Sequence, residues 1–370
     1  MNEQQRYIRQ MILPGFGNEA QAKLLAARVC IVGMGGLGCP ILQYLVAAGV
    51  GHIGMVDADA VSVSNLNRQL LFNDADIGKL KVEIAAAAMR KQNSAVQITT
   101  HPFALVKENA LSIIEQYDLV IDATDNFNTK YLINDVCVLL NKPWIYGAVS
   151  RYEGQLSVFN YLEQSNKNES VAINYRDLFP VSPLPNEIAS CEETGVIGVL
   201  PGIIGTMQAA EAIKMITGLG KILYGKLYTY HFLQATFFEI NILKPANALV
   251  IDAPFFEQTN YSHDCSTDDA EDLDEADIDE INVDQFIQMQ QDPDFFIVDV
   301  RERHEYPPID FADMQIPMSE LAGKIHQIPP KSICFICHQG IRSVYAAKQI
   351  KMSRNLQVYS LKGGLIAYFK

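Results

Sequence analysis

The stretch "RVCIVGMGGLGCPILQYLVAAGVGHIGMVDAD", residues 28–59, decides the fold of the first half of the chain. Its first apolar run, Val29–Val32, is typical of a buried strand, and the apolar spacing of residues 40–48 is typical of a helix. A second strand is expected over 52–56, and it ends at Asp57. The turn between the first strand and the helix holds four glycines: Gly33, Gly35, Gly36 and Gly38. This order predicts a βαβ unit with the pattern G-x-G-x-x-G, and hence a Rossmann-like α/β domain with a largely parallel sheet.

The glycine turn indicates a nucleotide site. Glycines allow a phosphate to approach the backbone amides at a helix N-terminus. Asp57, about 20 residues beyond the glycines, is placed to bind ribose hydroxyls. The pattern alone does not choose between NAD and ATP, because both nucleotides present phosphates and a ribose.

Polar residues that follow the later strands favour ATP. Asn65 and Arg68 come after the second strand, and Lys81 begins an expected helix. Asp122 and Asp125 come at the end of a further apolar strand. Because the carboxyl ends of parallel strands meet at one edge of a sheet, we expect these groups to gather there. An arginine, a lysine and a carboxylate suit charge stabilisation and magnesium placement in transfer at phosphorus, whereas hydride transfer does not need them.

Length and charge predict two domains joined by an acidic segment. A chain of 370 residues, 49% of them hydrophobic, is long enough for two cores. The formal net charge is −14, but residues 264–280 hold ten acids and no lysine or arginine, so the rest carries about −4. We expect a first α/β domain over 1–245, a solvated acidic linker over 246–283 and a smaller α/β domain over 284–370.

The composition also excludes several functions. A nearly neutral folded part disfavours general binding to nucleic acid. No apolar run is long enough to span a bilayer, and the first residues lack the pattern of a secretion signal. The seven cysteines are scattered without paired spacing, which is typical of a reducing compartment. We therefore expect a cytoplasmic protein without membrane or nucleic-acid partners.

Residues 1–245 resemble the MoeB/ThiF family of ubiquitin-activating-enzyme-like adenylyltransferases. The resemblance is carried by seven stretches in order: "RYIRQMIL" (6–13), "GMGGLGC" (33–39), "DADAVSVSNLNRQ" (57–69), "GKLKVE" (78–83), "DATDN" (122–126), "EGQLSVF" (153–159) and "CEETGVIGVLPGIIG" (191–205). In that family a dimeric enzyme uses ATP and Mg²⁺ to adenylate the C-terminal glycine of a small ubiquitin-like sulfur carrier.

The resemblance implies a role for each polar residue of the site. The residues that would bind ATP are Arg9, Gly33, Gly35, Gly36, Gly38, Asp57, Asp59, Asn65, Arg68, Lys81, Asp125 and Asn126. Within this set the glycines would hold phosphate, Asp57 the ribose, and Asp125 the Mg²⁺. Arg68, Lys81 and Asp125 would act in catalysis. Arg9 would reach the site of the second subunit of a homodimer.

Two further implications concern cysteine. Cys191 lies where members of the family carry a cysteine that takes the activated acyl group or pairs with sulfur, and a thiolate near a helix N-terminus is a competent nucleophile. Many relatives also hold a structural zinc with two C-x-x-C pairs, but this chain has Asn174 and Asp177 at the first pair. Cys265, beside His263, is the one candidate ligand near the second. Because a tetrahedral site needs four ligands, we expect no zinc and a region that relies on packing alone.

A second reactive thiol is expected in the stretch "SICFICHQGIRSVYAAKQIK", residues 332–351. Cys337 lies between an apolar strand and a helix, and four residues separate it from Arg342. Amides that converge on the sulfur and the positive end of the helix would stabilise a thiolate or a persulfide. Cys334 is either a resolving thiol or a packed core residue, and its place inside the strand favours the core.

This part of the chain resembles a rhodanese domain. The resemblance is carried by four stretches: "FFIVDVRERHEY" (295–306), "IPMSEL" (316–321), "CHQGIRS" (337–343) and "LKGGLIAYF" (361–369). The related phosphatase loop has five residues between cysteine and arginine and holds a phosphate, so four residues favour sulfur. The resemblance implies sulfurtransferase activity with Cys337 and Arg342 in the site.

Together these features predict an enzyme that adenylates a Gly-Gly-terminated sulfur carrier and converts it to a thiocarboxylate for thiamine or molybdopterin biosynthesis. A homodimer and a persulfide donor such as a cysteine desulfurase are the expected partners. One alternative is an adenylyltransferase whose rhodanese domain only docks or regulates, although docking needs neither Cys337 nor Arg342. A second is an NAD-dependent oxidoreductase, against which Arg68, Lys81 and Asp125 argue.

Overall fold

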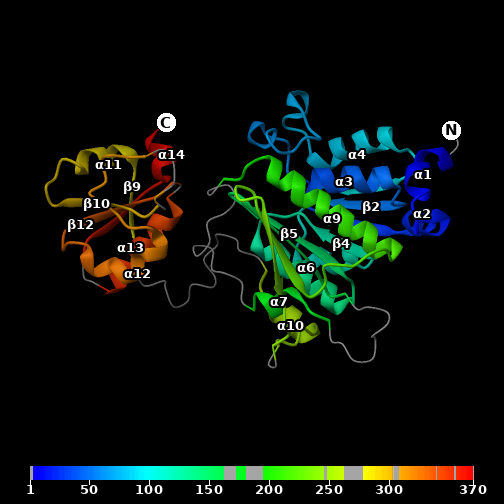
Figure 1. Ribbon diagram of the computed structural model, residues 1–370. Coiled ribbons are helices and arrows are strands. Elements are labelled where there is room, and N and C mark those ends of the chain that lie inside the picture. Colours follow the sequence, from blue (N-terminus) through cyan, green and yellow to red (C-terminus); the bar gives the residue numbers. More distant parts are fainter. Residues whose placement is uncertain are drawn as a thin grey trace. The chain divides into compact units, whose positions relative to one another are not determined.

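The protein is described by a computed structural model (Figure 1). The residues that it describes are 3–161, 172–180, 195–245, 248–261, 278–301, 303, 308–338, 340–353 and 356–369. Those up to 261 form one compact unit and those from 278 onward form a second. Each unit is described separately.

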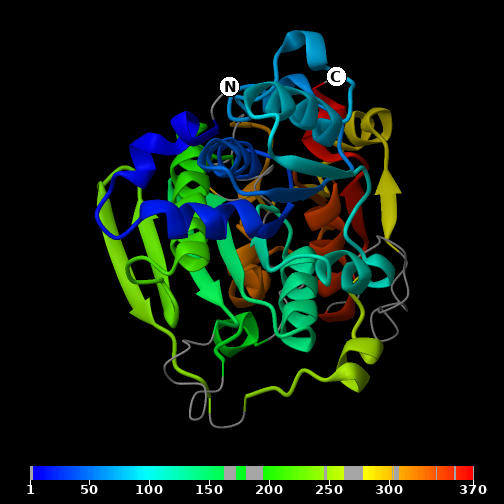
Figure 2. The same cartoon turned by 90° about the vertical axis from the view of Figure 1, so that its right-hand side faces the viewer.

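The first unit is built on an eight-stranded sheet with the order β3-β2-β1-β4-β5-β6-β7-β8. Its strands are β1 (Arg28–Val32), β2 (His52–Val56), β3 (Gln97–His101), β4 (Leu119–Asp122), β5 (Trp144–Ser150), β6 (Glu153–Phe159), β7 (Lys226–His231) and β8 (Thr236–Asn241). Strands β1 to β5 pair in parallel, and β5 to β8 pair antiparallel. The β7–β8 hairpin forms one edge (Figure 2). The predicted α/β class with a largely parallel sheet is confirmed.

Helices cover both faces of this sheet. They are α1 (Glu3–Met11), α2 (Gly17–Ala26), α3 (Gly38–Ala48), α4 (Lys81–Gln92), α5 (Lys107–Ile114), α6 (Phe127–Leu139), α7 (Tyr175–Leu178), α9 (Val199–Thr217) and α10 (Ala253–Gln258), with the short 3-10 turns η1 (Val63–Asn65) and η2 (Asp74–Asp76). Buried residues of α2, α3, α4 and α9 share one hydrophobic core, and those of α5, α6, α7 and α10 share the other.

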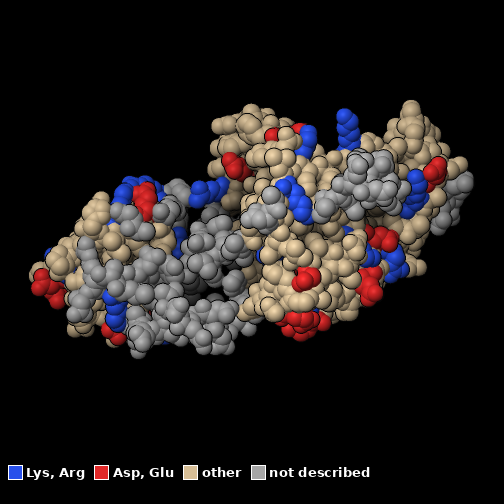
Figure 3. Space-filling view, turned by 90° about the horizontal axis from the view of Figure 1, so that it is seen from below, with Lys and Arg blue, Asp and Glu red and all other residues tan. Residues whose placement is uncertain are grey.

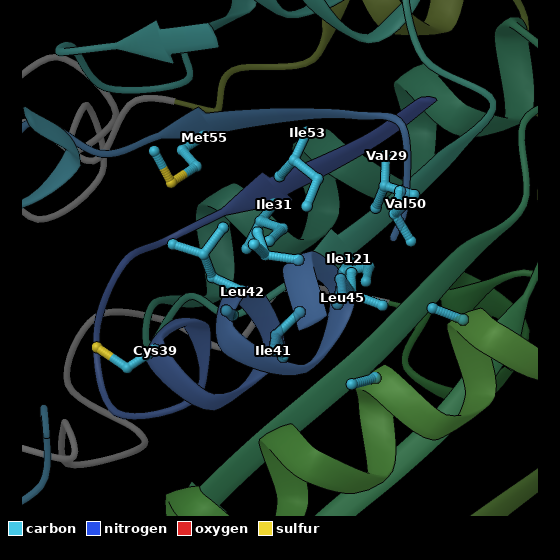
Figure 4. Packing of buried hydrophobic residues seen from close by; sticks show 14 of the residues in the cluster. Val29, Ile31, Cys39, Ile41, Leu42, Leu45, Val50, Ile53, Met55 and Ile121 are labelled. Atoms are coloured by element: carbon cyan, nitrogen blue, oxygen red, sulfur yellow. The ribbon is translucent and has the colours of Figure 1, made fainter. Parts of the chain in front are cut away.

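Strand β1 shows why the βαβ pattern folds as it does. Val29 and Ile31 point into the core that contains α3, where they lie with Leu42 and Leu45 (Figure 4). Cys30 and Val32 belong to the opposite core, as the period of two along a strand requires. Burial of each aliphatic side chain of this kind contributes about 1.5–3 kcal/mol to folding, so the core holds α3 in place against β1.

The second unit has a five-stranded sheet with the order β11-β10-β12-β13-β9, and all its pairings are parallel. Its strands are β9 (Asp279–Ile281), β10 (Phe295–Asp299), β11 (Met314–Gln315), β12 (Ser332–Ile336) and β13 (Val358–Leu361). Its helices are α11 (Val283–Met289), α12 (Leu321–Lys324), α13 (Ile341–Ser353) and α14 (Gly364–Tyr368), with 3-10 turns η4 (Met318–Glu320) and η5 (Ile325–Gln327). A hydrophobic core lies on each face of the sheet.

Two features bear on the predicted linker and surface. The range 246–283, where a linker is expected, contains α10, which packs in the first unit, and β9, which pairs with β13 in the second. No helix in the described part of the chain is long and apolar enough to cross a membrane. On the face shown in Figure 3, lysine and arginine are interspersed with aspartate and glutamate among the described residues.

Candidate nucleotide and sulfur sites

The first site lies where the order of the strands reverses. Strand β1 is flanked by β2 and β4. From β1 the chain builds β2 and β3 on one side of the sheet, and then β4 and β5 on the other side. In open α/β sheets ligands bind at such a switch point, outside the carboxyl ends of the strands. Gly33 follows β1 directly, and the turn after β4 begins at Asp122.

Two glycines shape the loop at this point. Gly33 has φ of 95°, and a Cβ there would lie 2.6 Å from the carbonyl oxygen of Ala123, in the turn after β4. A Cβ on Gly38 would overlap the carbonyl oxygen of Gly33 itself. The loop therefore closes tightly onto the N-terminus of α3, whose positive end favours an anion.

Asp57 ties the end of β2 to this loop. Its Oδ2 accepts a hydrogen bond from the Met34 amide at 2.6 Å, and its Oδ1 accepts one from the Asp59 amide at 2.7 Å. Burial raises the pKa of the Asp57 carboxyl, and the two amide bonds oppose that shift. Asp57 thus lies against the glycine loop, at the position where a ribose contact is expected.

Two cations lie close to the loop. The Lys81 Nζ is 2.7 Å from Asp59 Oδ2, and the Lys81 side chain is only 6% exposed whereas that of Asp59 is 69% exposed. Arg68 donates from Nη1 to the Ser64 carbonyl at 2.7 Å, and its Cγ would lie 3.5 Å from a Cβ on Gly36. Asn65 is buried at the end of η1, where its Oδ1 accepts from the Ser62 amide. The structure therefore brings these residues together around the carboxyl ends of β1 and β2.

Asp125 and Asn126 complete this edge of the sheet. Asp125 is exposed in the turn after β4, and Asn126 caps α6 by accepting a hydrogen bond from the Thr129 amide at 2.9 Å. A carboxylate and an amide that face solvent beside a phosphate loop are oxygen ligands of the kind that Mg²⁺ takes.

Arg9 is not part of this arrangement within one chain. Tyr7 packs closely on Gly49, and Gln10 donates to the Ala48 carbonyl at 2.9 Å, so α1 lies at the C-terminal end of α3. The glycine loop is at the opposite end of this 11-residue helix, about 16 Å away. Arg9 itself is exposed.

A cleft of about 430 Å³ opens beside the loop between α3 and α9, with Gly36, Arg68 and Gly202 in its lining. Gln69, which the sequence prediction passed over, is buried close by. Its Oε1 has no hydrogen-bond partner among the described residues, and its Nε2 would lie 3.7 Å from a Cβ on Gly35. One indication of Gln69 was present in the sequence: it is a polar residue that directly follows Arg68 in the same turn.

The segment of Asn174 and Asp177 is held by polar bonds. The two residues cap α7 reciprocally, since the Asn174 amide donates to Asp177 Oδ2 at 2.9 Å and Asn174 accepts from the Arg176 amide. Arg176 makes a buried bidentate ion pair with Asp135 of α6 at 2.7–3.1 Å, and the Tyr261 hydroxyl donates to the same carboxylate at 2.6 Å. The expectation of packing alone was therefore wrong.

Three cysteine and histidine positions lie outside the described residues. Cys191, Cys265 and His263 fall in the undescribed ranges 181–194 and 262–277. The role of Cys191 and the absence of zinc therefore stay predictions.

The second site surrounds Cys337 at the end of β12. The Cys337 side chain is 1% exposed, and its Sγ accepts a hydrogen bond from the Gly340 amide at 3.1 Å. Ser343 Oγ lies 3.4 Å from the sulfur, donates to the Gly340 carbonyl at 2.8 Å and accepts from Ser360 Oγ at 2.9 Å. Arg342, at the start of α13, is also buried. An amide and a hydroxyl thus contact the sulfur directly.

The turn into α14, residues 362–366, supports this loop. The Leu365 amide donates to the Cys337 carbonyl at 2.9 Å, and the Ile366 amide donates to the His338 carbonyl at 3.1 Å. Gly364 has φ of 58°, and a Cβ there would overlap the Cys337 carbonyl oxygen. Cys334 points into the core on the other face of the sheet from Cys337, and burial raises the pKa of its thiol. It is a packed core residue.

Comparisons with known proteins agree with this geometry. The ThiF family model matches residues 7–250. The sulfur carrier protein adenylyltransferase of Thermus thermophilus is 47% identical over 240 residues, which are 65% of this chain and 88% of that protein. The probable adenylyltransferase/sulfurtransferase MoeZ of Mycobacterium tuberculosis is 34% identical over 371 residues, 99% of this chain and 92% of that protein. The adenylyltransferase and sulfurtransferase MOCS3 of Drosophila persimilis is 38% identical, covering 98% and 82%.

A solved structure of E. coli MccB with MccA-N7isoASN has a TM-score of 0.57 at 22% identity, covering 67% of this chain and 74% of that one. It supports the fold of the larger unit. The family resemblance predicted from the sequence is confirmed.

Proposed function

The chain belongs to the ThiF family, and we propose that it adenylates the C-terminal glycine of a small sulfur-carrier protein and then delivers sulfur to it. The observation that carries this proposal is the convergence of the glycine loop, Lys81, Arg68 and Asp125 on one edge of the sheet. A second, separate unit holds the thiol of Cys337. The names of the relatives, which join adenylyltransferase and sulfurtransferase, support both halves of the proposal.

In the first step a carboxylate oxygen of the carrier attacks the α-phosphorus of ATP, and pyrophosphate leaves. The loop amides after β1 hold phosphate oxygens, and Asp57 orients the ribose. Lys81 and Arg68 stabilise the negative charge that grows on the phosphates, which is the largest single contribution in such transfers. Asp125, with Asn126 beside it, would hold Mg²⁺, which would supply neutralisation of the phosphate charge.

In the second step sulfur replaces AMP. Cys337 first takes a sulfane sulfur from a persulfide donor such as a cysteine desulfurase, and the donor leaves as a thiolate. The terminal sulfur of the Cys337 persulfide then attacks the activated carbonyl carbon, either of the adenylate or of a thioester on Cys191. Cleavage of the resulting acyl disulfide by a second thiol leaves the carrier as a thiocarboxylate and Cys337 in a disulfide.

We further propose that the enzyme is a homodimer in which Arg9 acts on the partner's site. The support is that α1 lies at the far end of α3 from its own glycine loop. Ile8, Ile12 and Leu13, which are close to Arg9 in sequence, are exposed apolar residues of the kind that an interface covers. We place the reaction in the cytoplasm, where the thiols stay reduced, and in thiamine or molybdopterin biosynthesis. The proposed domains are the two compact units, whose described residues end at 261 and begin again at 278.

The alternative of a rhodanese unit that only docks partners is disfavoured by the contacts of the Cys337 sulfur with the Gly340 amide and the Ser343 hydroxyl, which docking does not require. The proposal is tested by ATP–pyrophosphate exchange with purified small proteins that end in Gly-Gly. One such carrier should drive exchange in the wild type, and Asp125→Ala should lower the rate about a hundredfold. Near-normal exchange by Asp125→Ala would remove Asp125 from the site.

A further inference from the structure

A buried lysine lies directly beneath the turn that carries Asp125. Lys130, in the second turn of α6, is 4% exposed. Its Nζ donates to Asp122 Oδ2 at 2.7 Å, to the Thr124 carbonyl at 2.9 Å and to the Gly147 carbonyl at 3.0 Å. These three bonds use all three donors of the ammonium group. Lys130 therefore joins the end of β4, the turn after it and the neighbouring strand β5.

The partner carboxylate is equally constrained. Asp122 is fully buried, and its Oδ1 accepts from both the amide and the hydroxyl of Thr124, at 3.0 and 2.7 Å. Its backbone carbonyl accepts from Gln208 Nε2 of α9 at 2.7 Å. A buried ion pair adds little net stability compared with apolar residues, and buried charges are instead associated with fixing one geometry.

What this geometry fixes is the nucleotide site. Thr124 immediately precedes Asp125, and Asn126 immediately follows it as the cap of α6. The turn also touches the phosphate loop, because the Ala123 carbonyl lies where a Cβ on Gly33 would be. A shift of the turn would therefore move both the Asp125 carboxylate and the glycine loop.

We propose that Lys130 is a positioning residue for adenylation, which holds the Asp125 turn at the height needed to bind the magnesium complex of ATP. This inference rests on the proposed role of Asp125 in the site. A misplacement on the order of 1 Å in such a site can cost up to about a hundredfold in rate.

The test measures the affinity of the full-length protein for fluorescent mant-ATP at increasing Mg²⁺ concentrations. Lys130→Met alone would leave Asp122 buried without its cation. The double variant Lys130→Met with Asp122→Asn removes both charges, so that the fold can be retained while the three hydrogen bonds of Lys130 are lost. Lys142→Met is the matched control, because Lys142 also donates to two carbonyls, those of Glu115 and Tyr117, but before the start of β4.

We expect the double variant to unfold at a temperature close to that of the wild type and to lose about tenfold or more of the Mg²⁺-dependent gain in ATP affinity. Lys142→Met should keep that gain. A folded double variant with the Mg²⁺ dependence of the wild type would overturn the inference. If the double variant does not fold, Thr124→Val, which removes only the hydroxyl bond to Asp122, decides: a reduced dependence supports the inference and an unchanged one overturns it.

Asp125→Ala separates this inference from the proposed function. If Asp125→Ala binds ATP with the Mg²⁺ dependence of the wild type, the proposed role of Asp125 fails. If Asp125→Ala loses that dependence while the folded double variant keeps it, only the role of Lys130 fails.

Discussion

Lys81 keeps a charge in a nearly buried position, with the exposed carboxylate of Asp59 as its partner. Removing a charged group from water is costly unless a partner compensates, so the site holds this ammonium group at some expense in stability. An incoming phosphate can take over the interaction with Lys81, and the exposed Asp59 can turn to solvent. The charge is then already in place when negative charge grows on the phosphates.

Replacement of Lys81 by methionine should therefore lower ATP–pyrophosphate exchange about a hundredfold. Lys79→Met is the control, because Lys79 lies two residues away but is 55% exposed and pairs with Asp76 at 3.7 Å. It should exchange normally. Equal losses in the two variants would mean that general surface charge, and not a specific contact, supports the reaction.

Single residues also mark the limit of the sequence prediction. The glycines, Asp57, Lys81 and Asp125 could be singled out because their spacing after strands is a local pattern. The burial of Lys130 could not, because a lone lysine in a helix is normally taken as a solvated charge. The ion pair of Asp135 and Arg176 joins residues 41 positions apart, and no local pattern reports such a pairing.

Helices and turns hold both sites through contacts that are remote in sequence. The βαβ unit followed from the period of its apolar residues, and its strands and helix have the expected order. In contrast, α7 and the turn into α14 are held in place by hydrogen bonds between residues that are far apart in the sequence. For this reason the sequence predicted the elements of the sites but not the parts that support them.

The ion pair of Asp135 should stabilise the first unit strongly. Asp135→Ala leaves the guanidinium of Arg176 buried without its partner, and the expected loss in the free energy of unfolding is about 3–5 kcal/mol. Urea denaturation measures this loss. Glu19→Ala, which removes an 85%-exposed partner of Lys23, should cost less than about 1 kcal/mol. A similarly small loss for Asp135→Ala would show that the network does not stabilise α7.

The turn into α14, residues 362–366, should control sulfur transfer and not adenylation. Gly364→Ala places a methyl group against the Cys337 carbonyl and strains a positive φ, so the loop must move. We expect sulfur transfer from thiosulfate to fall by about tenfold or more while pyrophosphate exchange is unchanged. Lys362→Ala, an exposed neighbour in the same turn, should affect neither. Normal transfer by Gly364→Ala would contradict the proposed support of the loop.

The two units divide the chemistry between them. The first offers phosphate-binding groups and the second a sulfur held by an amide and a hydroxyl. Because the two units belong to one chain, we propose that a persulfide on the second acts on an adenylate on the first without a separate binding event. Length and the acidic run predicted this division, although the ordered parts extend further into the predicted linker.

Sharing of sites between subunits is tested by mixing two inactive variants. Arg9→Ala and Asp125→Ala chains should each exchange poorly. In a mixed dimer both changes fall in the site of the Asp125→Ala chain, and the site of the Arg9→Ala chain is intact because it receives Arg9 from the other chain. Activity should therefore recover on mixing after subunit exchange, which tagged chains can verify. No recovery in verified mixed dimers would show that Arg9 does not act across an interface.

The central claim is that one chain both activates the carrier and supplies its sulfur through Cys337. The most direct measurement is mass spectrometry of a Gly-Gly carrier after incubation with ATP, Mg²⁺, a persulfide donor and either the wild type or Cys337→Ser. We predict that both proteins support pyrophosphate exchange and that only the wild type converts the terminal carboxylate to a thiocarboxylate. Thiocarboxylate formation by Cys337→Ser at the rate of the wild type would contradict the claim.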